Sequence, residues 1–252
     1  PTRRSSDLAQ AGRRGIVRDT EIELLLRDYA APIFQAAGIG KGSIRIALMD
    51  DRSFNAFVTD GRRMFINTGT LMDAKTPNEI IGVIAHESGH VAGGHLTRQR
   101  EQMAAAQMMA VAGVLLGAGA MVAGSGSRSS NAGNGGVGVM LGAQELAGRT
   151  LLSYQRGEEQ AADRAAIKYL EMTSQSPKGL LDTFKRLSDD MMFKKEGLDP
   201  YLMSHPMPQD RIANLETLVM ASGNYKAKDP TELQARHEMM RAKLLGFVGK
   251  PE

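Results

Sequence analysis

The stretch Ala85–His95, AHESGHVAGGH, places three histidines and one glutamate within eleven residues. His86 and His90 are one helical turn apart, so in a helix they project from the same face and their neutral imidazoles can bind one metal ion. Glu87 would lie beside that ion without binding it, where a general base belongs if a metal-activated water is to attack a peptide carbonyl. Because H-E-x-x-H also arises by chance on surface helices, the third metal ligand is the discriminating test.

The residues around the histidines predict a buried helix. Thr76 to Glu79, TPNE, forms a capping box with proline at the favoured first helical position, and the helical pattern continues through the histidines without a break. Residues 80–84 are isoleucine and valine apart from one glycine, which supplies the burial. Gly89 inside the motif leaves room for another segment to approach closely. Two histidines on such a helix need partners.

His95 does not fit the pattern for a third histidine ligand. In the H-E-x-x-H-x-x-G-x-x-H arrangement of metzincins the last histidine follows the first by ten residues, and Leu96 occupies that position here. On a continuous helix the step from His86 to His95 is a rotation of roughly 180°, onto the opposite face. We therefore interpret His95 as a helix-end or packing histidine.

A candidate third ligand lies far along the chain, in the segment EEQAAD. Glu159 on a separate helix could complete a set of two histidines and one glutamate, which leaves one coordination position for water as a catalytic zinc site requires. Asp163, one turn later, could accept the free ring N–H of a ligand histidine and fix its tautomer. The alternative is that Glu158, Glu159 and Asp163 form a solvated helix face, which is the commoner fate of such a run.

The composition limits the classes of function. The 252 residues carry 31 Lys and Arg against 28 Asp and Glu, a net charge of +3 scattered in both signs, so nucleic-acid binding has little support. The absence of cysteine excludes disulfides, a thiolate zinc site and a cysteine nucleophile. Any metal must be held by histidine, aspartate or glutamate.

The periodicity predicts a mostly helical α+β fold. Thr20 and Glu23 form a capping box that opens a first amphipathic helix, and the residues after Gly38 read as a strand followed by a hairpin around Asp60 and Gly61. We expect these strands to form a small antiparallel sheet. Further helices are predicted after the histidine helix, over residues 151–169, after Ser176-Pro177, and over 210–221 and 230–247.

Residues 103–123 are nearly all alanine, glycine, methionine, valine and leucine, and loop-forming residues follow over 124–136. The apolar stretch is long enough to cross a membrane, which takes about 20 apolar residues. It has few large apolar side chains and no charged residue at its end, which favours a small-residue helix packed over the site and followed by a mobile loop.

Three segments in order resemble the signatures of the HtpX/BepA-type zinc metallopeptidases, which are gluzincins. They are NAFVTDGRRMFINTGTLMDAKTPNEIIGVIAHESGHVAGGH, YQRGEEQAAD and SHPMPQDRI, and the resemblance covers about Asp19 to Ser222. It implies a gluzincin-type metalloprotease fold that binds one zinc ion per chain through His86, His90 and Glu159. Asp163 would be the aspartate that orients a ligand histidine.

The resemblance also implies roles for residues outside the histidine helix. The hairpin that carries Phe57 and Phe65 would offer an edge strand to an extended substrate. His205 is a candidate proton donor, oxyanion partner or occluding metal ligand, and Arg211 a candidate organiser or oxyanion partner. Asn55 would position substrate or loop backbone, unless it is a turn asparagine. His237 lies outside the motifs, and we expect it on the surface of its helix.

The soluble, periplasmic BepA-like branch is the one most resembled. It implies a zinc endopeptidase that cleaves misfolded or misassembled outer-membrane proteins and works with the outer-membrane barrel assembly machinery, with a signal peptide lost here. The alternatives are a chaperone-like binding protein with a latent, self-occluded protease site and a membrane-associated HtpX-like protease.

From the sequence we divide the chain into three parts. Residues 1–8, PTRRSSDL, can be back-translated into a sequencing adapter, so we expect them to be non-native. Residues 9–222 are the expected metalloprotease domain. Residues 223–252 are a C-terminal helical extension that resembles the start of a repeat domain.

Overall fold

The computed structural model describes residues 15–59, 61–125, 131–193 and 200–248, so the segment 1–8 lies outside it. The chain divides into two compact units, which are described separately. The core unit comprises residues 1–93 and 160–252, and the hairpin unit comprises Gly94–Glu159. The boundary falls within one continuous helix, directly after Glu159.

The mostly helical α+β fold predicted from the sequence is confirmed. The described helices of the core unit are α2 (Thr20–Ala36), α3 (Thr68–Asp73), α4 (Pro77–Gly93), the end of α6 (Asn131–Met172), α7 (Lys178–Phe193), α8 (Pro200–Ser204), α9 (Gln209–Ala221) and α10 (Thr231–Val248). Its strands are β1 (Ile16–Val17), β2 (Arg45–Met49), β3 (Ala56–Thr59) and β4 (Arg63–Asn67).

The sheet has the order β1-β2-β4-β3, and β3 is an edge strand among the described residues. β3 and β4 form the expected antiparallel hairpin, with Phe57 opposite Phe65. The expectation of a purely antiparallel sheet is wrong, because β2 pairs with β4 in parallel, with Ile46 opposite Met64. The chain leaves β2 and skips one strand position to form β3. After the turn, β4 lies between β2 and β3 in the sheet. It is antiparallel to β3 and therefore runs in the same direction as β2.

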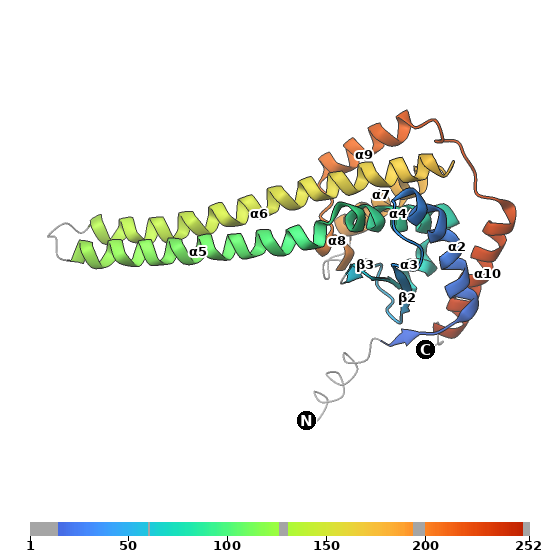
Figure 1. Ribbon diagram of the computed structural model, residues 1–252, viewed down its shortest axis with the longest axis horizontal. Helices are drawn as coiled ribbons and strands as arrows, with labels where there is room; N and C mark the ends of the chain where they lie inside the picture. The colour runs from blue at the N-terminus through green and yellow to red at the C-terminus, as the bar shows by residue number, and fades with distance from the viewer. Residues whose placement is uncertain (1–14, 60, 126–130, 194–199, 249–252) are drawn as a thin grey trace, which may run out of the picture. The chain divides into compact units, whose positions relative to one another are not determined.

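Helix α4 is at the centre of the core unit (Figure 1). It packs against α2, α7 and β3, while α2 also contacts β2 and α7 contacts α9. The first thirteen residues of α4 are all buried, as its run of isoleucine and valine predicted. The apolar face predicted for α2 is buried too, although its N-terminal cap is Asp19, whose side chain accepts from the backbone N–H groups of Glu21 and Ile22.

Helix α10 packs against α2, α3 and α4, and this buries His237 completely. The expectation that His237 is a surface residue is therefore wrong. Its Nε2 lies 3.0 Å from the carbonyl oxygen of Ala74, and its Nδ1 lies 3.0 Å from the hydroxyl of Tyr29. Since a carbonyl can only accept, Nε2 carries the proton and the tyrosine donates to Nδ1.

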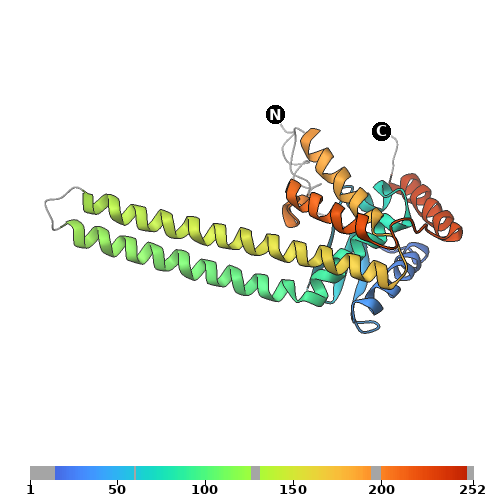
Figure 2. The ribbon, with the colours of Figure 1, turned by 90° about the horizontal axis from the view of Figure 1, so that it is seen from above.

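The hairpin unit consists of α5 (His95–Ser125) and the first part of α6, which lie side by side in Figures 1 and 2. They approach so closely that a Cβ on Gly113 would lie 2.2 Å from the Cβ of Ala143. Within α5, residues 95–119 are long and apolar enough to cross a membrane by length and composition, and only 11% of that window is buried. The expected helix is present and its small residues pack against α6, but most of its surface is not buried.

The loop expected over residues 124–136 is shorter than predicted. Helix α5 continues to Ser125, and α6 begins at Asn131. The remaining part of this expectation, residues 126–130, lies outside the described residues.

Candidate metal site

The two histidines of the motif lie on one face of α4, as their spacing predicted. Their Nε2 atoms are 3.1 Å apart and their rings meet edge to face. His86 is completely buried, and Glu87, on the next position of the helix, is 2% exposed. The motif is therefore part of the protein interior and not a pair of histidines on a surface helix.

Gly89 allows the end of α6 to approach α4 closely. A Cβ at this position would lie 2.9 Å from the carbonyl oxygen of Ala162 and 3.0 Å from its Cα. Both of these are backbone atoms and cannot rotate away. The glycine therefore brings the backbone of α6 next to the histidine motif, with Asp163 at the contact.

Asp163 connects His86 to Arg211. The Nδ1 of His86 lies 3.0 Å from Oδ1 of Asp163, and Arg211 donates from Nε at 2.7 Å and from Nη2 at 2.8 Å to the same carboxylate. Burial of Asp163 opposes its ionisation, but the hydrogen bonds and charge of Arg211, together with His86, outweigh it and hold the pKa of this carboxyl below its ordinary value. The carboxylate thus accepts from Nδ1–H of His86 and leaves Nε2 for a metal.

The contacts of Arg211 favour the organiser role over the oxyanion role. Its Nη1 donates to the carbonyl oxygen of Pro206 at 3.1 Å, and its guanidinium lies 5.0 Å from the centre of the Phe184 ring. The side chain is 3% exposed, and these contacts fix it between α6, α7 and the segment that follows α8.

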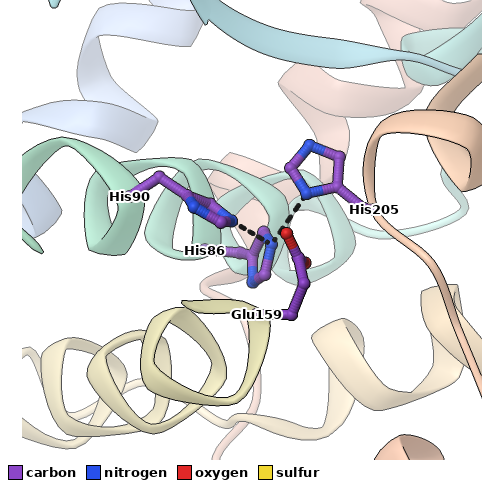
Figure 3. Close-up of side chains that lie close together, drawn as sticks. All are labelled: His86, His90, Glu159 and His205. Carbon is purple, nitrogen blue, oxygen red and sulfur yellow. Dashed lines mark hydrogen bonds between the residues drawn. The ribbon is translucent and has the colours of Figure 1, made fainter. Parts of the chain in front are cut away.

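Glu159 lies one turn before Asp163 on α6, and its ligand oxygen gathers with nitrogens of His86, His90 and His205 (Figure 3). All four ligand atoms lie within 4.8 Å of one another. Glu159 is 5% exposed and Asp163 is 3% exposed, so the alternative of a solvated helix face is wrong.

His95 is not in this group of described residues that could hold a metal. The preceding residue, Gly94, has φ of +69°, a left-handed conformation that suits glycine and separates α4 from α5. His95 is therefore the first residue of α5, and its Nε2 lies 2.6 Å from Oε2 of Glu158. It is a buried residue at a helix end.

His205 follows α8 and points into the site. Its Nδ1 lies 3.4 Å from Nε2 of His86, and its Nε2 lies 3.5 Å from Oε1 of Glu87. Its ring stacks on Tyr201 at 4.6 Å, and Phe184 meets the ring of His86 edge to face at 5.4 Å. Neither aromatic residue was predicted from the sequence, although the position of Tyr201 four residues before His205 is a signal that could have identified it.

The donor set fits a zinc ion. It consists of three imidazole nitrogens and a carboxylate oxygen, which are ordinary zinc ligands. Two nitrogens at about 2.0 to 2.1 Å from a tetrahedral zinc are about 3.3 to 3.4 Å apart. The observed separations of 3.1 Å for His90 to His86 and 3.4 Å for His86 to His205 are close to that value.

Of the three residues expected to bind substrate, Phe57 and Phe65 lie on the β3–β4 hairpin and Asn55 directly precedes β3. Phe57 and Phe65 stack across the strands at 5.3 Å and are half-buried, on the side of the hairpin opposite its buried residues. The backbone of Asn55 is held by Thr70, whereas its side-chain oxygen is buried with no hydrogen-bond partner among the described residues. This orphaned acceptor is not typical of a simple turn asparagine.

Comparison with known proteins gives a family match over most of the chain. The model of Peptidase family M48 matches residues 18–219. The putative beta-barrel assembly-enhancing protease of Vibrio cholerae is 27% identical over 202 residues, which are 79% of this chain and 39% of that protein. The beta-barrel assembly-enhancing protease of Yersinia pestis is 25% identical over 81% of this chain and 40% of that protein. Metalloprotease LoiP of Escherichia coli is 28% identical over 68% of this chain and 61% of that protein.

The chain thus spans about two fifths of the length of the beta-barrel assembly-enhancing proteases that it matches. The predicted kinship with metallopeptidases is confirmed, and the match of more than 200 residues includes both the histidine helix and the segment around Asp163. The chain belongs to peptidase family M48.

Proposed function

We propose that this protein is a zinc-dependent endopeptidase in which His86, His90 and Glu159 hold the zinc ion. The observation that supports this most is the buried cluster of ligand atoms beside a buried glutamate. Burial of this many ionisable groups is costly unless a metal or mutual hydrogen bonds compensate. Asp163 holds His86 in the tautomer that a zinc ligand requires.

The residues around the cluster support hydrolysis of a peptide bond. When bound, the zinc ion supplies a Lewis acid that activates water and polarises the substrate carbonyl. Glu87 is next to a ligand on α4, and it is the carboxylate placed to accept a proton from the attacking water and pass it to the leaving amine. The proton therefore passes from the water through Glu87 to the amine, and Glu87 returns to its carboxylate form.

The edge strand β3 supports a substrate in extended conformation. It packs against α4, the helix that carries the motif, and its free edge can pair with the backbone of an extended peptide. The side-chain oxygen of Asn55, directly before β3, is buried without a partner among the described residues, and it would accept a backbone N–H of that peptide once the side chain turns outwards. The stacked rings of Phe57 and Phe65 add an apolar surface for a substrate side chain.

The position of His205 supports a second state of the same site, in which the protease is latent. Its Nδ1 is as close to His86 as a ligand of the same ion would be, and it lies where an attacking water would otherwise be bound. In this state the chain would bind zinc through four residues and could hold unfolded proteins without cleaving them. Activity would then require His205 to leave the site.

We further propose that the substrates are misfolded or misassembled outer-membrane proteins in the bacterial periplasm. The support is the similarity to proteases named for enhancing β-barrel assembly. Since this chain spans about two fifths of them, association with the barrel assembly machinery would involve a repeat domain outside the matched part.

The test combines metal analysis with cleavage of casein, with and without chelator. We expect one zinc per chain; Glu87→Gln should keep the zinc and lose about 100-fold or more in cleavage rate, the usual range for a general base. Glu159→Ala should lose zinc, whereas the control His95→Ala should keep it. Full activity of either glutamate variant would overturn the assignment.

The latent state has its own test. His205→Ala should retain zinc and cleave casein faster than the parent protein. A slower His205→Ala protein would instead assign His205 to the reaction as a proton donor or oxyanion partner.

A further inference from the structure

The hairpin unit carries an uncharged surface of exposed apolar side chains. No charged residue occurs in Met103–Ser125 of α5 or in Asn131–Gln144 of α6. The large apolar side chains exposed on the two helices include Met108, Val111, Leu115, Leu116, Val122, Val137, Val139, Leu141 and Leu146. Several of them are exposed by more than 60%, which is costly in water.

The exposed residues of α5 surround the helix and do not form a single stripe. At about 100° per residue, the positions from Met103 to Val122 that are exposed cover roughly 240° of the circumference. A protein partner usually covers one stripe of a helix, with polar residues on the opposite face. A helix that is apolar on nearly all sides is typical of contact with lipid.

The burial and the position of α5 distinguish it from a core helix and from a leader segment. A core helix of this composition would be mostly buried, whereas only 11% of the window from His95 to Gly119 is buried. A leader segment would precede the folded domain, whereas α5 follows α4 and the complete sheet. Neither kind of helix accounts for this exposed apolar surface.

Among the described residues of the hairpin unit, charges occur only before Met103 on α5 and after Gln144 on α6, and the remaining charged residue, Arg128, lies outside the described residues. Arg98, Arg100 and Glu101 precede the apolar part of α5, and Arg98 is joined to Glu158 near the end of the unit. On α6 the first charges are Glu145 and Arg149, which pair with each other at 2.5 Å. This distribution leaves an uncharged stretch on each helix, which on α5 is largely apolar.

The length of the apolar part matches a bilayer. Met103–Ser125 is about 34 Å long at 1.5 Å per residue, and the hydrocarbon core of a bilayer is about 30 Å thick. Arg149 lies about 27 Å along α6 from Asn131, so its charge would be near the headgroups on the side of entry. The uncharged part of α5 is therefore long enough to cross the hydrocarbon core, whereas that of α6, Asn131–Gln144, is about 21 Å long and reaches about two thirds of it.

We propose that the hairpin unit inserts into a lipid bilayer through Met103–Ser125 and Asn131–Gln144. These two segments of the hairpin unit would attach the protein to a membrane, and neither contains a residue of the metal site. This inference does not depend on the proposed peptidase activity.

Flotation of the purified full chain with vesicles of phosphatidylethanolamine and phosphatidylglycerol tests the proposal. We expect the protein to float with the vesicles. The double variant L115K/L116K should partition at least about tenfold more weakly, because a lysine is strongly disfavoured in hydrocarbon. Met239→Lys is the matched control, since Met239 is 71% exposed on α10 and Leu115 is 68% exposed on α5.

The absence of cysteine permits a second measurement that does not rely on a charged variant. Single Leu115→Cys and Met239→Cys proteins, each labelled with a polarity-sensitive fluorophore, should differ in how their emission wavelength responds to vesicles. Only the label at position 115 should shift to the blue when vesicles are added.

The proposal is overturned if the protein stays with the soluble fraction, or if L115K/L116K floats as well as the parent. It is also overturned if the label at position 115 is already shifted in lipid-free buffer in a concentration-dependent way, which would assign this surface to contact between two copies of the chain. Zinc content and casein cleavage of L115K/L116K are measured in parallel, so a failure of the peptidase assignment is recognised separately.

Discussion

Replacement of Gly89 by alanine tests whether the close approach of α4 and α6 builds the metal site. The added methyl would lie 2.9 Å from the carbonyl oxygen of Ala162 and 3.0 Å from its Cα, where ordinary van der Waals contact begins at 3.4 Å. Since both neighbours are backbone atoms, the helices must separate by about half an ångström, and such overpacking costs about 1–3 kcal/mol.

The net effect can be estimated from opposing terms. Alanine is a better helix former than glycine by about 1 kcal/mol, so we expect a net loss of up to about 2 kcal/mol in the free energy of unfolding. For a chain of this length that lowers Tm by up to about 8 °C, whereas the matched control described below should not lower it. The separation also weakens the contact of Asp163 with His86, and loss of such support typically lowers metal affinity about 10- to 100-fold.

The assays are thermal unfolding of the metal-free protein and zinc affinity by competition with a chromophoric chelator. Gly157→Ala is the matched control, because this glycine is exposed on α6 and a Cβ there would meet no atom within 4 Å. We expect the control to be neutral or slightly stabilised with unchanged zinc affinity. If Gly89→Ala behaves like Gly157→Ala in both assays, the close approach does not build the site.

Three further predictions concern buried polar contacts. Asp163→Asn should lower zinc affinity about 10- to 100-fold, measured by the same competition, and an unchanged affinity would remove the tautomer argument for His86. Arg211→Gln leaves the carboxylate of Asp163 buried without its cation, and should destabilise the fold by about 3–5 kcal/mol in urea unfolding; a loss below about 1 kcal/mol would contradict this. Burial lowers the pKa of His237 below 6.5, so below that pH the unfolded chain binds a proton that the folded chain does not. The free energy of unfolding should therefore fall as pH decreases from 6.5, less steeply in His237→Phe, and equal slopes would refute the assignment.

The parts of the site that depend on one helix were predictable from the sequence. The spacing of His86 and His90 determines that both lie on one face of α4, whatever surrounds the helix. The role of Gly89 in close approach was also predictable, because glycine within a strongly apolar helix indicates contact with another backbone. The identity of that other backbone was not, since Ala162 is 73 positions further along the chain.

Neither the direction of the strands nor the burial of His237 could be predicted from the sequence, and the reasons are related. Alternating apolar residues predict a strand but not its neighbour, so nothing in Arg45–Met49 indicated that it would pair in parallel with β4. Similarly, one histidine on an amphipathic helix has no local signal for burial. Its environment is set by Tyr29 and the carbonyl of Ala74, which belong to distant parts of the chain.

His205 shows why the sequence left three roles open for one residue. Each role needs only a histidine near the metal, and a proline-broken loop does not fix which ring nitrogen faces it. The structure places Nδ1 beside His86 and Nε2 beside Glu87, so the ring touches both a metal ligand and the proposed base. A ring in that position competes with the attacking water, whereas the same ring turned away from His86 could still donate to a leaving group. The proposed latent and active states would therefore differ in the position of one side chain, and the sequence, which is the same in both, does not distinguish them.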